Sequence, residues 1–178
     1  METWIVGLFA LLSCVTYTEN SQLPSTVHRQ TEFAFDVSAP FQTVVPLFGS
    51  DKERLWAEGW NPHFVYPQPA NDQAGAVFTI DAGHSNVWIN TIYDLDQGHI
   101  QYACFAAEGM VTLIDIRVQR STSDTTRVIV VYERTALRPE ANDHVNRVAD
   151  NDKAKGPEWE AALRSYLQKL GGIGNSKP

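Results

Sequence analysis

Residues 110–137, MVTLIDIRVQRSTSDTTRVIVVYERTAL, contain the clearest fold signal in the chain. From residue 114 to 118, apolar side chains alternate with polar ones, which is the period of a strand with one face in a core. Residues 128–132 are almost continuously apolar, which is typical of a central strand. The polar cluster at 121–124 has the length of a hairpin turn. The stretch therefore predicts two adjacent antiparallel strands.

Similar strand patterns occur upstream at short intervals. Residues 27–37 alternate between apolar and polar, and residues 94–98 (DLDQG) have the composition of another hairpin turn. Since short turns join antiparallel strands, the simplest arrangement is a meander of about six to seven strands. The expected strands are 27–37, 74–81, 87–93, 99–106, 110–120 and 125–137.

Helix signals stand at the two ends of this run of strands. After Pro40, apolar residues recur at helical spacing to Phe48, and a helical turn and an irregular aromatic segment follow over 51–69. Pro157 begins a long amphipathic helix that we expect to end at Gly171–Gly172, with its apolar stripe on Trp159, Leu163, Tyr166 and Leu170. This order predicts an α+β fold in which helices cover one face of an antiparallel sheet.

Composition limits the classes of function. The 178 residues are 43% hydrophobic, which is sufficient for one globular domain with a core. The net charge of -7 disfavours nucleic acid and anionic membrane surfaces as partners. Two cysteines are too few for a disulfide framework or a cysteine-rich zinc site.

The N-terminus carries a short apolar run, residues 4–12 (WIVGLFALL). It is too short to cross a bilayer but has the length of a signal-peptide core, and Cys14 after Leu-Leu-Ser resembles a lipoprotein acylation site. The acidic Glu2 stands where a leader has a positive charge, which an upstream start or a different role, an apolar arm packed on the domain, would each explain. Residues 1–25 are thus a leader and tether or an arm, 26–172 the domain and 173–178 a flexible tail. If residues 1–14 are a leader, we expect the protein in the cell envelope or periplasm. If they are not, we expect it in the cytoplasm.

Four segments resemble one known superfamily: 47–62 (LFGSDKERLWAEGWNP), 75–79 (GAVFT), 125–135 (TTRVIVVYERT) and 158–160 (EWE). They are similar to a subgroup of the SRPBCC superfamily, the START-like, polyketide-cyclase-type proteins. The resemblance covers 26–172 and implies the helix-grip fold, a curved antiparallel sheet wrapped around a long C-terminal helix, with two short helices after the first strand. Relatives carry Pro-Glu-Gly-Glu where this chain has Gly-Ser-Asp-Lys at 49–52.

A sheet curved around a helix leaves space for an apolar ligand, and the aromatic residues of this chain suit the walls of such a space. Trp56 and Trp60 could equally be core residues, with Arg54 and Glu58 as a surface pair four residues apart. The expected cavity lining is Trp56, Trp60, His63, Phe64, Tyr66, Phe78, Trp88, Tyr102, Phe105, Trp159 and Tyr166.

Signals for catalysis are weaker. The five histidines lack the spacing of a metal site, and nucleotide-binding and nucleophile-elbow motifs are absent, so we expect no metal and no cofactor. Cys104 shares the parity of core residues and is expected to be an inert thiol. Candidates for acid–base work in a cavity are Glu58, His63, Tyr66, His99 and Tyr102.

Three functions remain open. The first is non-catalytic binding or carriage of a small hydrophobic or amphipathic molecule, lipid- or polyketide-like, with membrane contact only through an N-terminal anchor. The second is a cyclase- or hydrolase-like enzyme with His63 or a cavity carboxylate as base. The third is a chaperone-activator-like domain, which predicts an exposed apolar patch and a collapsed interior. The superfamily hosts all of these activities, so fold alone does not decide, and the sequence leaves the oligomeric state open.

Overall fold

The computed structural model describes residues 25–80 and 86–174, with side chains described as far as residue 171. The expected leader or arm, including Cys14, lies outside these residues. Within the described part of the chain, no helix is both long enough and apolar enough to cross a membrane.

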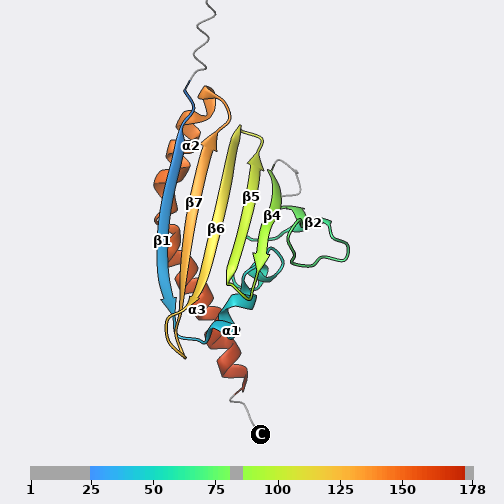
Figure 1. The fold of residues 1–178 in the computed structure, drawn as a ribbon, viewed down its shortest axis with the longest axis vertical. Coiled ribbons are helices and arrows are strands. Elements are labelled where there is room, and N and C mark those ends of the chain that lie inside the picture. The colour runs from blue at the N-terminus through green and yellow to red at the C-terminus, as the bar shows by residue number, and fades with distance from the viewer. Residues whose placement is uncertain (1–24, 81–85, 175–178) are drawn as a thin grey trace, which may run out of the picture.

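Seven strands, three short 3-10 helices (η) and three α-helices follow one another along the described chain (Figure 1). In chain order they are β1 (His28–Val37), α1 (Phe41–Val44), η1 (Val45–Leu47), η2 (Lys52–Leu55), β2 (His63–Tyr66), β3 (Val77–Thr79), β4 (Asn86–Asp94), β5 (His99–Ala106), β6 (Met110–Arg120), β7 (Thr126–Ala136), η3 (Pro139–Ala141), α2 (Asn142–Asp152) and α3 (Lys155–Gly174).

The strands form one antiparallel sheet in the order β1-β7-β6-β5-β4-β3-β2. The first strand pairs with the last, with Phe35 opposite Val128, so the meander from β2 to β7 ends beside β1. Helices α2 and α3 cover one face of this sheet (Figure 1). The predicted α+β architecture, an antiparallel sheet with a long C-terminal helix and short helices after the first strand, is confirmed.

Strand alternation decides which side chains meet the helices. Ile116, Val128 and Val130 point to the helix side and are fully buried, as the apolar pattern of β6 and β7 predicts. Leu163 of the C-terminal stripe is also fully buried and joins the same core. The core therefore occupies the space between the concave face of the sheet and α3.

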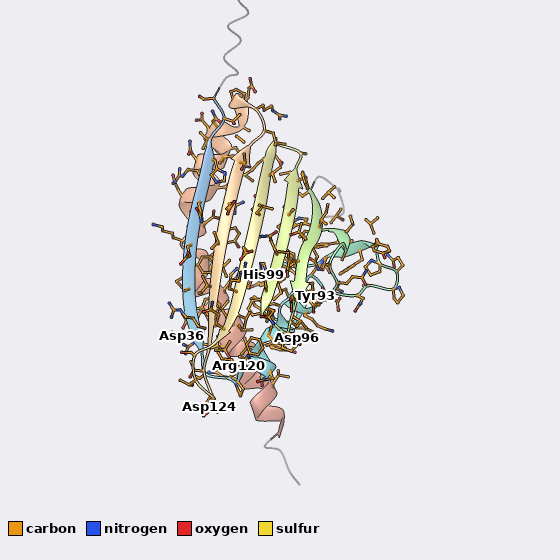
Figure 2. All side chains as sticks on the ribbon, in the orientation of Figure 1. Asp36, Tyr93, Asp96, His99, Arg120 and Asp124 are labelled. Atoms are coloured by element: carbon orange, nitrogen blue, oxygen red, sulfur yellow. The ribbon has the colours of Figure 1, made fainter. Side chains whose placement is uncertain are left out.

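Polar and short helical elements close one end of this space. Figure 2 shows Asp36, Arg120 and Asp124 near the turn that joins β6 to β7. The Arg120 guanidinium lies 4.0 Å from the ring centre of Phe41 at the start of α1, and the Thr126 hydroxyl donates to the Ala39 carbonyl at 2.7 Å. A pocket of about 470 Å³ remains at this end between Ala39, Thr43 of α1 and Leu167 of α3, and a larger cavity lies toward the β5–β6 hairpin.

Three elements differ from the sequence expectation. Helix α2 was not predicted, because it has only two buried apolar side chains, Val145 and Ala149. Strand β2 lies within the segment expected to be irregular, where prolines obscure the strand pattern. Helix α3 continues to Gly174 instead of ending at Gly171–Gly172.

Candidate functional site

A cavity of about 850 Å³ lies between the concave face of the sheet, helices α2 and α3, and the segment after η2. Strands β4 to β7 supply one wall through their inward-facing residues, and α3 supplies the opposite wall through Trp159 and Ala162. Exposed glutamates from three separate segments form part of its rim: Glu58, Glu108 and Glu158. The aromatic side chains of the lining are Trp56, Trp60, Trp88, Tyr102, Tyr132 and Trp159.

The tryptophans of the wall are fixed by hydrogen bonds and by one another. The Trp56 indole donates to the Leu47 carbonyl at 2.7 Å and the Trp60 indole to the Ser50 carbonyl at 2.9 Å. Trp60 meets Trp88 edge to face at 5.2 Å between ring centres, and Trp56 meets Trp159 at 5.6 Å. Trp56 and Trp60 therefore serve both as core residues and as cavity wall.

Five of the residues named from the sequence line this cavity: Trp56, Trp60, Trp88, Tyr102 and Trp159. Phe105 does not, because it follows Cys104 in a strand and must point to the opposite, outer face, where 47% of its side chain is exposed. That strand has only one inward parity, so Tyr102 and Phe105 cannot share the lining.

The remaining named residues lie elsewhere for two reasons. His63 and Tyr66 are exposed on β2 at the edge of the sheet, and Phe64 of the same strand stacks on Phe78. Phe78 is fully buried and contacts Trp60 and Trp88, so it supports the wall from behind. Tyr166 is half-buried on α3 two turns beyond Trp159 and outside the cavity. His63 is thus not positioned to act as a base in the cavity.

The chemically most distinctive residue of the wall is one that the sequence analysis missed, Glu53. Its Oε1 accepts a hydrogen bond from the Tyr102 hydroxyl at 2.5 Å and a longer one from the Gly49 N–H at 3.4 Å, and only 2% of the residue is exposed. Burial raises the pKa of Glu53 to about 8, against the lowering effect of these two hydrogen bonds. Glu53 lies between Lys52 and Arg54, so local sequence predicts an exposed charge.

A half-buried carboxylate, Asp72, holds the start of the helical turn that carries Glu53. It accepts hydrogen bonds from the Ser50 hydroxyl at 3.0 Å and from the backbone N–H groups of Asp51 at 2.7 Å and Lys52 at 3.1 Å, which fixes the start of η2. Gly49 has φ +135°, and a Cβ there would lie 2.5 Å from the Asp72 carboxylate. Glycine is therefore required where the chain bends around Asp72.

The cations that line the cavity are already paired. Arg134 forms a bidentate bond with Asp152 of α2, with both distances 2.7 Å. Lys155 contacts Glu158 at 2.8 Å. By contrast, no basic side chain of the described residues forms an ion pair with Glu58 or Glu108. The unpaired charges at the cavity are therefore carboxylates.

The expected surface pair between Arg54 and Glu58 does not form. The Arg54 guanidinium instead lies 3.3 Å from Asp51 and donates to the Pro62 carbonyl at 3.0 Å. Glu58 is consequently left at the cavity rim without a cationic partner among the described residues.

Two polar atoms of the wall lack partners. Within the described chain, Asn86 Oδ1 and Trp88 Nε1 are buried and make no hydrogen bond. Both residues line the cavity from β4, two positions apart and so on the same face. Buried polar groups are nearly always paired, so these two atoms, which the surrounding protein encloses, are an unsatisfied acceptor and an unsatisfied donor behind the cavity surface.

Other titratable groups are unsuited to chemistry in the cavity. Burial raises the pKa of the Cys104 thiol to about 12, so it stays protonated although it touches the wall. His99, labelled in Figure 2, bonds Asp115 at 2.7 Å on the outer face of the sheet. Among the described residues, no cluster of three or more histidine, cysteine or acidic side chains could hold a metal ion.

Solved structures share this architecture. Norcoclaurine synthase from Thalictrum flavum, a point mutant bound to a transition-state analogue, matches 83% of this chain and 99% of its own with a TM-score of 0.61 at 12% identity. The crystal structure of Ara h 8.0201 matches 80% of this chain and 99% of its own, with a TM-score of 0.57 at 13% identity. The Zhui aromatase/cyclase from Streptomyces sp. R1128 matches 81% and 96%, with a TM-score of 0.55 at 14% identity.

The chain has the helix-grip fold. This is the fold that the resemblance of the sequence implied. No protein-family model and no curated protein matches the sequence.

Proposed function

We propose that this protein binds and carries a small, mainly apolar molecule in the cavity of its helix-grip domain. The observation that carries the proposal is the cavity of about 850 Å³ with six aromatic side chains in its lining. Ligand sites of proteins have this size and are mostly apolar with a few polar groups. Norcoclaurine synthase, which has the same fold, has been solved with dopamine and hydroxybenzaldehyde, which are small aromatic molecules.

The polar groups of the wall favour one class of ligand. Burial of apolar area provides the main free energy, at roughly 25 cal/mol per Å². A polar end of the ligand would meet the exposed carboxylates of the rim, Glu58 and Glu108. Because Glu58 and Glu108 have no cationic partner among the described residues, that end is neutral or cationic and not anionic.

Adjacent alanines of α3 allow a matched test. Ala162 lines the cavity, whereas Ala161 is exposed. We expect the neutral probe 1-N-phenylnaphthylamine to fluoresce when it binds the wild type and the Ala161→Trp variant. Ala162→Trp fills the cavity and should weaken binding at least about tenfold, which corresponds to about 1.4 kcal/mol. Equal binding by both variants, with both folded by circular dichroism, would reject the cavity as the site.

The same titration can test the polar end of the ligand. We expect 4-phenylbutylamine and 4-phenylbutanol to displace the probe more effectively than 4-phenylbutyrate, because the carboxylate meets the unpaired Glu58 and Glu108. Preferential displacement by the carboxylate would contradict the assignment of the polar end but leave the apolar cavity as the binding site.

The chaperone-activator-like alternative is less well supported. It predicts a collapsed interior, and a cavity of about 850 Å³ argues against that. Envelope localisation through Cys14 stays a prediction, which the intact mass of the protein from its own host would test through a diacylglyceryl addition.

A further inference from the structure

The hydrogen bonds of Glu53 do not explain why an ionisable residue is buried at this position. Its Oε1 accepts hydrogen bonds from Tyr102 and Gly49, and a glutamine oxygen could accept both. Glutamine would also avoid the cost of placing an ionisable carboxyl in an apolar site. The ability that glutamate adds at this position is the binding and release of a proton.

The position of the Glu53 carboxyl group places its proton-binding oxygen at the cavity. Both hydrogen bonds use Oε1, and Oε2 has no partner among the described residues. Glu53 lines the cavity beside Trp56 and Ala57. A molecule in the cavity can therefore meet Oε2, while Tyr102 fixes the orientation of the carboxyl group.

The described groups around Glu53 do not include a cation that would hold its carboxyl group in the ionised form. The titratable groups that face Glu53 are Tyr102 of β5, Tyr93 of β4, Tyr132 of β7 and Asp72. All four are acids, and the two cations of the described lining, Arg134 and Lys155, are each paired with another carboxylate, Asp152 and Glu158. No neighbouring cation among these groups locks Glu53 in its ionised form.

We propose that the cavity catalyses proton transfer, with Glu53 as the base that takes a proton from a carbon acid bound there and Tyr102 as its positioning residue. This inference rests on the proposed function, because the substrate must enter the same cavity. A carboxylate withdrawn from water is a stronger base than one in solution, and a base with a pKa close to the working pH is the most effective.

The chromogenic probe 5-nitrobenzisoxazole tests this directly. The ionised carboxylate of Glu53 would take the proton from C3, the electrons of that C–H bond would form the nitrile, and the N–O bond would break with its electron pair on oxygen. The product is 2-cyano-4-nitrophenolate, measured by its absorbance, and Glu53 returns the proton to solvent. No other reactant is needed.

Wild-type kcat/KM should rise with pH and level off above an inflection near 8, the pKa of Glu53. Glu53→Gln should lower kcat/KM at least about hundredfold. Glu133→Gln is the matched control, because residue 133 lies between the inward-facing Tyr132 and Arg134 and so points to the outer face. It should leave the rate unchanged.

Tyr102→Phe separates catalysis from a structural role and covers the case in which Glu53→Gln does not fold. Its hydroxyl hydrogen bond lowers the pKa of Glu53, so its removal should move the inflection to higher pH. A purely structural Tyr102 would leave the inflection in place. An unmoved inflection, or a wild-type rate no faster than that of Glu53→Gln, overturns the inference.

Failure of this inference can be distinguished from failure of the proposed function. If 1-N-phenylnaphthylamine binds the wild type and not Ala162→Trp while the benzisoxazole is not converted, the binding function stands and the catalytic assignment is wrong. If the naphthylamine probe does not bind either, both are wrong.

Discussion

Glu53 is exposed to water in the unfolded chain and buried in the folded domain, so its ionisation is linked to folding. In the unfolded chain it ionises near its ordinary pKa of 4.5, and in the folded protein burial raises that pKa to about 8. Between these values the folded state holds a proton that the unfolded state has released. The free energy of unfolding therefore falls as pH rises through this window, and the contribution levels off above pH 8.

The Glu53→Gln substitution should remove this pH dependence. We expect its stability relative to the wild type to increase from pH 5 to pH 8 by about 1 kcal/mol per pH unit, measured by urea denaturation at each pH. Parallel stability curves for the two proteins over this range would show that Glu53 is ionised in the folded state.

At the level of single residues, the sequence predicted the tryptophan walls but not the chemistry. Trp56, Trp60, Trp88 and Trp159 are large aromatics that must be buried somewhere, so composition alone indicates them. Buried Glu53 is hydrogen-bonded to Tyr102, and the charge that further raises its pKa is Asp72; both residues lie far away in sequence. No local pattern contains that information.

The pairing of Arg134 with Asp152 connects two elements, β7 and α2, beside the cavity. Their side chains are 11% and 4% exposed, and Arg134 also donates to the Thr112 hydroxyl at 2.8 Å. Removal of one partner leaves a buried charge without compensation.

We therefore expect Arg134→Met to lower the free energy of unfolding by about 3 kcal/mol or more. The matched control is Arg127→Met, which breaks the exposed pair with Asp36 and should cost less than about 1 kcal/mol. Urea denaturation of the two variants measures both effects. Similar losses for the two would mean that the buried pair does not anchor α2.

The turn between β4 and β5 depends on Gly98. It has φ +64°, and a Cβ would lie 2.1 Å from the Val118 carbonyl oxygen. Gly98→Ala should therefore destabilise the protein by about 2 kcal/mol or more.

Gly171 of α3 provides the contrast, because a Cβ there meets nothing within 4 Å. Gly171→Ala should change stability by no more than about 1 kcal/mol, in the stabilising direction, since alanine favours the helix. Thermal denaturation distinguishes the two variants, and a tolerated alanine at position 98 would contradict the described turn.

Strands in which apolar and polar residues alternate regularly were predictable, and elements with few apolar residues were not. Strands β5 and β6 have the bounds that alternation gave, His99–Ala106 and Met110–Arg120. Helix α2 packs on β1 and β7 through few apolar residues, Val145 and Ala149, and is otherwise polar, so hydrophobicity does not distinguish it from a surface loop. The prediction of the cavity lining was wrong at Phe105, because this aromatic residue was assigned to the inner face although alternation along β5 places it on the outer face.

For the whole molecule, the cavity follows from the shape of the fold and was expected from it. A sheet that wraps around α3 on one side keeps space near the β5–β6 hairpin, and a smaller pocket of about 470 Å³ lies beside α1 at the other end. The outer face also carries apolar side chains: Val87 and Phe105 are paired across β4 and β5 and are 40% and 47% exposed. The outer pair of Val87 and Phe105 is therefore an apolar surface that could bind a small apolar molecule in competition with the cavity.

The measurement that separates them is a crystal structure of the protein with 1-N-phenylnaphthylamine. The account predicts the probe inside the cavity, in contact with Trp88 of β4 and Trp159 of α3, with the outer face of the sheet free of ligand. A probe bound at Val87 and Phe105, with the cavity left unoccupied, would contradict the central claim that this helix-grip domain binds its ligand internally.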